Sequence, residues 1–270
     1  MDAALHEQRG ASGLPAGLFR ADVRAAVALS AVPLRLDESV GTILLDIEGT
    51  TTPIEFVHNI LFPYARARVR DFLEQHAADP DVRADLALLK REHAAGSPHE
   101  SGLPPWEPVA YVHWLMDRDR KSTGLKSLQG KIWEEGYRAG ALRGQAQVYP
   151  DVAPALSRWR KQGRGIAIFS SGSVQAQRNL FANTTAGDLA PFLSRYFDTT
   201  TGPKRERESY ERIAAALRRQ PKEVLFLSDV GAELEAAREA GMRTALCVRS
   251  PAAVPGSSAH PIIRTFDEVV

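Results

Sequence analysis

Short apolar runs alternate with polar turns and helical patterns along most of this sequence. The segments 42–45, 165–169 and 224–229 are mostly apolar, as is typical of strands buried on both faces of a sheet, and 244–248 is also strand-like. Helical spacing of apolar residues marks four further segments, at 152–161, 174–183, 206–219 and 232–240. This alternation predicts an α/β fold with a mainly parallel sheet covered by helices on both faces.

Residues 56–144, between the first two predicted strands, have a different pattern of apolar and polar positions. They are helical in pattern, and a break that contains proline and glycine, at 96–108, divides them into two parts. The positions that show helical spacing are Val69, Phe72, Leu73, Leu125, Leu128 and Ile132. Because this insertion directly follows the first strand, we expect a helical cap over the mouth of the site, with 41–55 and 145–270 as the core domain.

Residues 1–40 form an extension that precedes the core. Its apolar run, 25–34, follows two arginines and faintly resembles a signal sequence. The run is far shorter than the roughly 20 residues of a membrane span, and the long stretch before it contains acidic residues. We therefore expect a frayed or surface-docked extension rather than export.

Composition narrows the possible partners. The 270 residues are 44% apolar and 25% charged, as in a soluble globular protein. A formal net charge of +1 produces no extended positive potential that would attract nucleic acid or an anionic membrane, so we expect neither as a partner. The single cysteine, Cys247, permits no internal disulfide and is expected to be buried, which favours a reducing, cytoplasmic location. Without a coiled-coil heptad, a monomer is the default expectation.

The first candidate for chemistry is Asp46, which follows the strand at 42–45. Open α/β sheets place ligands at the carboxyl ends of their strands, and Glu48 and Gly49 follow at once. Two carboxylates so close together imply a cation, and Mg²⁺ uses few protein carboxylates together with water and phosphate. A carboxylate held against Mg²⁺ and phosphate can act as a nucleophile. The alternative is an ordinary turn rich in polar residues after a strand.

Polar groups follow the other predicted strands in the same way. Ser170 and Ser171 lie at a strand-to-helix junction, where hydroxyls and backbone N–H groups can bind an anion, although a serine there can also simply cap a helix, as we expect of Ser173. Lys204 precedes a polar helix and could neutralise a phosphate, although a lone lysine is usually solvated. Asp229 ends a further strand. The order acid, serine, lysine, acid, each near a strand end, indicates a phosphate-transfer site.

This order of motifs resembles the haloacid dehalogenase superfamily of phosphohydrolases. Within it, Asp-Ile-Glu-Gly-Thr-Thr-Thr at 46–52, with Glu where most members carry Asp, resembles the acireductone synthases, the bifunctional enolase–phosphatases of methionine salvage. The resemblance covers about residues 41 to 250 and implies a Rossmannoid parallel sheet with an inserted helical cap. Further matching segments are 61–64, 119–121, 125–130, 170–174, 208–210 and 225–230.

The resemblance also implies roles for individual residues. Asp46 would form an aspartyl-phosphate, and Glu48 would protonate the leaving oxygen and later activate water. One Mg²⁺ per subunit would be held by Asp46, Asp229 and the backbone carbonyl of Glu48. Glu233 could hold a metal-bound water, although a solvated acid in the first turn of a helix is an equal alternative.

The implied substrate is 2,3-diketo-5-methylthiopentyl-1-phosphate, whose phosphate Ser170, Ser171 and Lys204 would hold. Its enolisation needs a base, for which Glu48 is a candidate, and a cation such as Mg²⁺ or a cap lysine. Lys121 and Lys126 are the candidate lysines, and a solvated helix face is the alternative for both. Two other functions stay open: a Mg²⁺-dependent phosphatase for another small phosphometabolite, and a non-catalytic phosphate-binding scaffold.

Overall fold

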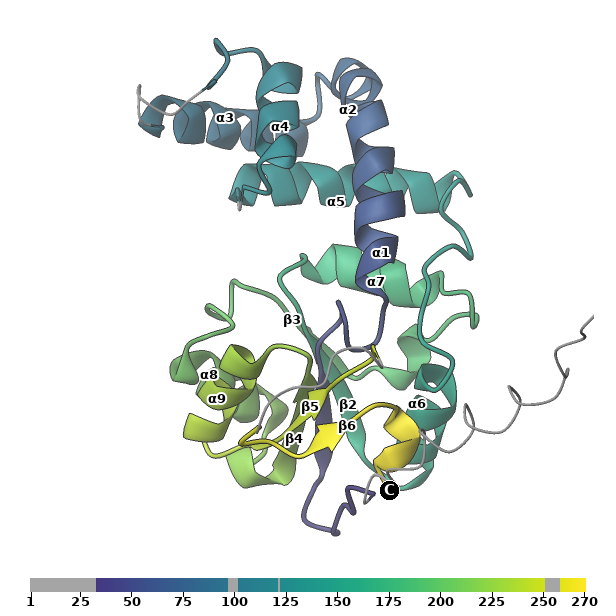
Figure 1. Ribbon diagram of the computed structural model, residues 1–270. Helices are drawn as coiled ribbons and strands as arrows, with labels where there is room; N and C mark the ends of the chain where they lie inside the picture. Colours follow the sequence, from purple (N-terminus) through teal and green to yellow (C-terminus); the bar gives the residue numbers. More distant parts are fainter. Residues whose placement is uncertain (1–32, 97–101, 121, 251–257) are drawn as a thin grey trace, which may run out of the picture. The chain divides into compact units, whose positions relative to one another are not determined.

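A six-stranded parallel sheet forms the centre of the chain in the computed structural model (Figure 1). The structure describes residues 33–96, 102–120, 122–250 and 258–270. The sheet order is β3-β2-β1-β4-β5-β6, and every neighbouring pair is parallel, which confirms the predicted α/β class. The strands are β1 (Thr42–Leu45), β2 (Gly165–Phe169), β3 (Arg195–Phe197), β4 (Val224–Ser228), β5 (Arg243–Cys247) and β6 (Ile262–Ile263).

The predicted strands are all present, whereas β3 and β6 were not predicted. These two strands have three and two residues, too few for a periodic pattern to show. They are also the two edge strands of the sheet, where Arg195 and Ile262 are exposed. Cys247 is a free, buried cysteine in β5, as expected, and burial raises the pKa of its thiol to about 12.

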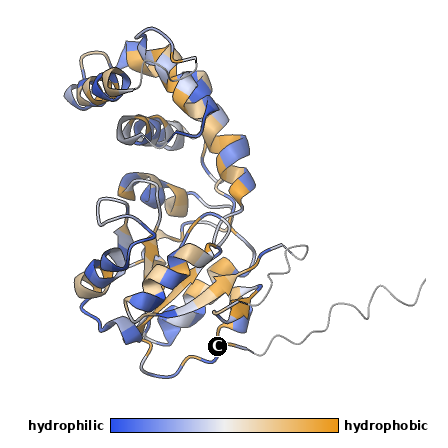
Figure 2. Cartoon of the chain, turned by 60° about the vertical axis from the view of Figure 1, so that its left-hand side comes forward, coloured by the Kyte–Doolittle hydropathy of each residue, from blue (hydrophilic) through white to orange (hydrophobic). Residues whose placement is uncertain are grey.

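Helices cover both faces of the sheet, as the strand–helix alternation predicts. Alternate side chains of the central strand point to opposite faces, so that Ile43 and Leu45 pack with α6 (Val152–Lys161) and α7 (Val174–Ala182). Leu44, between them, packs with the layer of α8 (Arg207–Leu217) and α9 (Gly231–Glu239). Figure 2 shows the apolar residues gathered on the strands and on the helix sides that face them.

Residues 33–40 lie against the core, whereas residues 1–32 and most of the predicted apolar run fall outside the described residues. Leu34 forms a β-bridge with Val269, and the Leu36 N–H donates to the Val270 carbonyl oxygen at 2.6 Å. The Arg164 guanidinium donates to backbone carbonyls of this segment, including those of Leu36 and Val40. No helix in the described parts of the chain is long and apolar enough to cross a membrane.

The described part of the segment between β1 and α6 is mostly helical, and α3 ends and α4 begins on either side of the predicted break. Val69, Phe72, Leu125, Leu128 and Ile132 are buried, in agreement with the helical spacing, and Leu73 is half-buried. The helices are α1 (Ile54–Phe56), a π-helix η1 (Val57–Leu61), α2 (Phe62–Gln75), α3 (Pro80–Ala95), α4 (Pro108–Asp117) and α5 (Thr123–Arg138). Short 3₁₀ turns in the core are η2 (Ala190–Phe192), η3 (Pro221–Glu223) and η4 (Phe266–Glu268).

The π-helical turn η1 has a local cause in Pro63. Proline has no N–H to donate, and in an α-helix its ring collides with the carbonyl four residues earlier, here that of Asn59. The wider π turn bonds the Phe62 N–H to the Val57 carbonyl five residues back. The chain can therefore run from α1 into α2 without a break.

Gly124, in the first turn of α5, is packed tightly against α3. A Cβ at this position would lie 2.7 Å from Cγ of Leu89, a fully buried side chain. We therefore expect Gly124→Ala to lower the free energy of unfolding by about 1–3 kcal/mol through overpacking, although alanine is the better helix former. Gly231→Ala is the control, because nothing lies within 4 Å of a Cβ there. Thermal unfolding tests the pair, and an equal or higher midpoint for Gly124→Ala would contradict the packing argument.

Candidate active site

The carboxyl ends of three central strands lie side by side in the sheet. Leu45 of β1 pairs with Ile168 of β2 and with Leu227 of β4, so that the residues after each strand are neighbours. The sheet order runs in one direction from β1 to β3 and in the other from β4 to β6, and such a topological switch point creates a crevice. Asp46 and Asp229 lie beside it, and the Asp46 N–H donates to the Leu227 carbonyl oxygen at 3.0 Å.

A buried cluster of charged side chains lies at these carboxyl ends. Lys204 Nζ is 2.6 Å from Asp46 Oδ1 and 2.7 Å from Glu233 Oε2, and the lysine side chain is 11% exposed. Lys204 is therefore not a solvated surface lysine. Nor is Glu233 a solvated acid, and its direct ion pair with Lys204 was not predicted. Ser228 adds a hydroxyl that donates to Glu233 Oε2 at 3.2 Å and lies 3.4 Å from Asp46 Oδ2.

The loop that carries Lys204 is held by the first turn of α8. Ser209 Oγ donates to the Pro203 carbonyl oxygen and the Tyr210 hydroxyl donates to the Lys204 carbonyl oxygen, both at 2.7 Å. Both side chains are fully buried, and burial raises the pKa of Tyr210, which keeps the hydroxyl protonated as a donor. The segment 208–210 therefore positions the loop that carries Lys204. Sequence analysis identified this segment only through its resemblance to a known family.

The cluster has more negative than positive charge. Burial, and then the charge of Asp46, raise the pKa of Asp229 to about 6 and that of Glu233 to about 7. Burial acts to lower the pKa of Lys204, but the Asp46 and Glu233 carboxylates hold it above its ordinary value. One ammonium thus faces three converging carboxylates, an arrangement that an additional cation would stabilise.

The residues present fit Mg²⁺. Gly49 has φ of 70°, and a Cβ there would lie 2.2 Å from Asp229 Oδ2, so glycine lets this carboxylate approach the turn after β1. In the described parts of the chain, no three His, Cys, Asp or Glu side chains form a ready-made metal cage. The candidate donors are the carboxylates of Asp46 and Asp229 with the Glu48 carbonyl, a small set of oxygens that suits an ion which keeps several waters.

The threonines of the turn after β1 hold its shape. Thr50, Thr51 and Thr52 are fully buried, and the N–H groups of Thr51 and Thr52 both donate to the Ile47 carbonyl oxygen at 2.9 Å. Thr50 Oγ1 accepts from the Asp229 N–H at 3.1 Å. The threonine run therefore joins the turn after β1 to the end of β4.

Arg249, just after β5, clamps this turn from the opposite side. Its Nε and Nη2 donate to the Thr50 carbonyl oxygen at 2.9 and 2.7 Å, and its Nη1 donates to Asp151 Oδ2 at 2.6 Å. The guanidinium carbon lies 4.4 Å from the ring centroids of both Tyr149 and Phe266. Sequence reasoning missed this clamp, since nothing in the pattern links residue 249 with residue 50.

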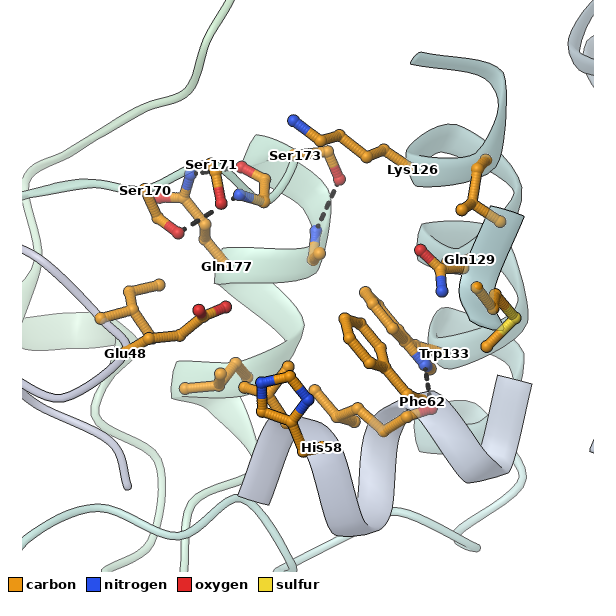
Figure 3. A pocket seen from close by; sticks show the side chains of 18 of the residues that line it. Glu48, His58, Phe62, Lys126, Gln129, Trp133, Ser170, Ser171, Ser173 and Gln177 are labelled. Carbon is orange, nitrogen blue, oxygen red and sulfur yellow. Dashed lines mark hydrogen bonds between the residues drawn. The ribbon is translucent and has the colours of Figure 1, made fainter. Parts of the chain in front are cut away.

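A cavity of about 270 Å³ adjoins the charged cluster (Figure 3). Glu48, Ser170 and Ser171 line it from the core, and Glu48 points into it. Asp46, Lys204 and Asp229 do not line this cavity, but the chain connects Asp46 to it through Ile47. The structure thus places the predicted residues in two adjoining groups, the buried charges and the cavity wall.

The insertion supplies the other side of the cavity, which is mostly apolar. The apolar lining residues from the insertion include Leu61, Phe62, Leu115, Met116, Leu125 and Trp133. Lys126 also lines it from α5, whereas Lys121 lies outside the described residues. Ser173 accepts a hydrogen bond from the Ala176 N–H at 3.2 Å, which confirms its predicted role as the cap of α7.

This arrangement agrees with the relatives of the chain. Residues 40–241 match the haloacid dehalogenase-like hydrolases, and the chain belongs to this family. Within it, the chain is 55% identical to Enolase-phosphatase E1 of Synechococcus elongatus, over 87% of this chain and 99% of that protein. It is 47% identical to Enolase-phosphatase E1 of Sorangium cellulosum, over 89% and 99%. Among solved structures, the UTR4 protein of Saccharomyces cerevisiae matches with a TM-score of 0.65 and 33% identity, over 84% of this chain and 99% of that one. The predicted haloacid dehalogenase-like fold is confirmed.

The Arg249 clamp leads to a prediction about stability. The side chains of Arg249 and Asp151 are 7% and 8% exposed, so Arg249→Met leaves a buried carboxylate without its cation. We expect a loss of about 3–5 kcal/mol in the free energy of unfolding, measured by urea denaturation. Arg160→Met, at an exposed position of α6, is the control and should change it by less than about 0.5 kcal/mol. Equal effects of the two variants would show that the clamp does not stabilise the turn.

Proposed function

We propose that this chain is a Mg²⁺-dependent enolase–phosphatase that converts 2,3-diketo-5-methylthiopentyl-1-phosphate to acireductone and phosphate in methionine salvage. The observation that carries the proposal is the position of Asp46, at the end of β1, 2.6 Å from Lys204 and next to a cavity with hydroxyls on one side. The enolase-phosphatase relatives, which the chain matches over almost their whole length, support the choice of reaction. The apolar side of the cavity suits a methylthioalkyl chain.

In the phosphatase step, an Asp46 carboxylate oxygen attacks phosphorus while the bond from phosphorus to the substrate oxygen breaks. Glu48 gives that oxygen a proton, and then takes one from the water that hydrolyses the aspartyl-phosphate. Ser170, Ser171 and Lys204 hold the phosphate oxygens during both events. Mg²⁺, when bound by Asp46, Asp229 and the Glu48 carbonyl, offsets negative charge on the phosphoryl group.

In the enolase step, a base removes a proton from the carbon between the phosphate oxygen and the first carbonyl. The C–H electron pair becomes the new C=C bond, and the carbonyl oxygen takes up a proton. Glu48 points into the cavity and is our candidate base. Lys126 lines the same cavity and is our candidate to stabilise negative charge on the enolate oxygen.

Asp46→Asn separates the two steps. The change keeps the size of the side chain but removes the attacking oxyanion, so we expect phosphate release to fall by at least about a thousandfold. The phosphorylated enol should then accumulate. Enol absorbance and free phosphate, followed separately, measure the two steps in the variant and in the wild-type protein. Metal affinity, measured by calorimetry, controls for lost Mg²⁺.

Two results would contradict the proposal. One is phosphate release by Asp46→Asn within about tenfold of wild type, which would remove Asp46 from the nucleophilic role. The other is release of phosphate by the wild-type protein from the unenolised diketone. A generic aryl phosphate, included in parallel, distinguishes a phosphatase with another substrate from a scaffold that releases no phosphate.

Removal of the metal should abolish turnover. We expect activity to vanish with a chelator, to return with Mg²⁺, and to be inhibited by Ca²⁺, whose larger and looser coordination misplaces the phosphoryl group. Phosphate release is the measurement, and circular dichroism of the chelated protein controls for unfolding. Full activity after exhaustive chelation would refute a role for the metal.

A further inference from the structure

Gln129, in the middle of α5, is a buried polar residue on the cavity wall. Its side chain is 6% exposed, yet it makes no hydrogen bond with any of the residues that the structure describes. Figure 3 shows it pointing from α5 into the cavity, on the side opposite to Ser170 and Ser171. Its amide therefore faces the cavity and can bond with a molecule there, whether water or substrate.

The surroundings of Gln129 would favour an apolar side chain. Leu125, Gln129 and Trp133 are spaced four residues apart on one face of α5, and all three line the cavity. The indole Nε1 of Trp133 already donates to the Leu61 carbonyl oxygen at 2.8 Å. Gln129 therefore places an amide between two apolar side chains of the cavity wall.

Two other polar side chains of the cavity wall already have structural roles. Ser173 caps α7, and Gln177 Nε2 donates to the carbonyl oxygens of Gly172 and Phe197, both at 2.8 Å. The Gln129 amide has both a donor and an acceptor to offer to a molecule in the cavity.

We infer that the Gln129 amide binds the carbonyl pair of the substrate, an inference that rests on the proposed function. With the phosphate held near Ser170 and Ser171, the part of the substrate that crosses the cavity toward α5 is its dicarbonyl chain. The amide N–H group donates to a carbonyl oxygen. The amide oxygen accepts from the hydroxyl that enolisation creates. Gln129 is thus a substrate-binding residue that selects phosphorylated diketones over simple alkyl phosphates.

The test combines one substitution with two ligands. Gln129→Met keeps the length of the side chain and removes both hydrogen-bonding groups. The diketone phosphate is the substrate, and 5-methylthiopentyl phosphate, which lacks the two carbonyls and cannot enolise, is a competitive inhibitor. We expect Gln129→Met to lower kcat/KM for the diketone phosphate by about 10–100-fold more than it weakens inhibition by the carbonyl-free ester. Gln75→Met, at an exposed position of α2, is the matched control and should show no such difference.

The outcomes distinguish failure of the role proposed for Gln129 from failure of the proposed enzymatic function. An equal loss in kcat/KM for the diketone phosphate and in affinity for the carbonyl-free ester would overturn the role of Gln129, since the amide would then serve only packing or bind water. Failure of the wild-type protein to convert the diketone phosphate would refute the proposed function, and the role of Gln129 with it. The thermal midpoint of Gln129→Met verifies folding. Gln129→Leu, which matches the neighbouring Leu125 and Leu128, replaces it if methionine does not fit.

Discussion

The contact of Lys204 with two carboxylates is the constraint around which the site is built. Its ammonium lies within 2.7 Å of both Asp46 and Glu233, in a position where all three side chains are nearly excluded from water. Removal of either sign of charge would leave the other buried without compensation, which is far less favourable than leaving the whole group intact. The loop before α8, the end of β1 and the start of α9 must therefore come together for any one of them to be stable.

The candidate nucleophile is also held from outside the site. Arg249 bonds the backbone of the turn after β1, and the Thr50 hydroxyl passes this restraint to the backbone of Asp229. Asp151, beyond the insertion, completes the clamp through its bond with Arg249. A rigid turn keeps the two candidate metal-binding carboxylates in fixed positions, so that their alignment does not have to be created when substrate arrives.

The sequence predicted most of the sheet and the order of the charged residues, because both depend on local patterns. Continuous apolar runs specify β1, β2 and β4, and the strand-end rule places Asp46 and Asp229 together. The sequence did not predict contacts between residues far apart in the chain, or strands of only two or three residues. Arg249 bonds a carbonyl about two hundred residues away, and β6 has two residues. Gln129 looked like one more member of a matching segment, since a sequence cannot reveal that a buried side chain points into a cavity.

The π-helix η1 constrains the length of the chain between β1 and α2. A π turn accommodates one more residue than the corresponding α turn, and each residue of an α-helix turns the chain by about 100°. Because Pro63 still requires the wider turn, a chain shortened by one residue here would bring in α2 rotated by about 100°, with Val69 and Phe72 no longer facing the core. Descendants of this sequence can therefore exchange side chains in this segment far more readily than they can change its length.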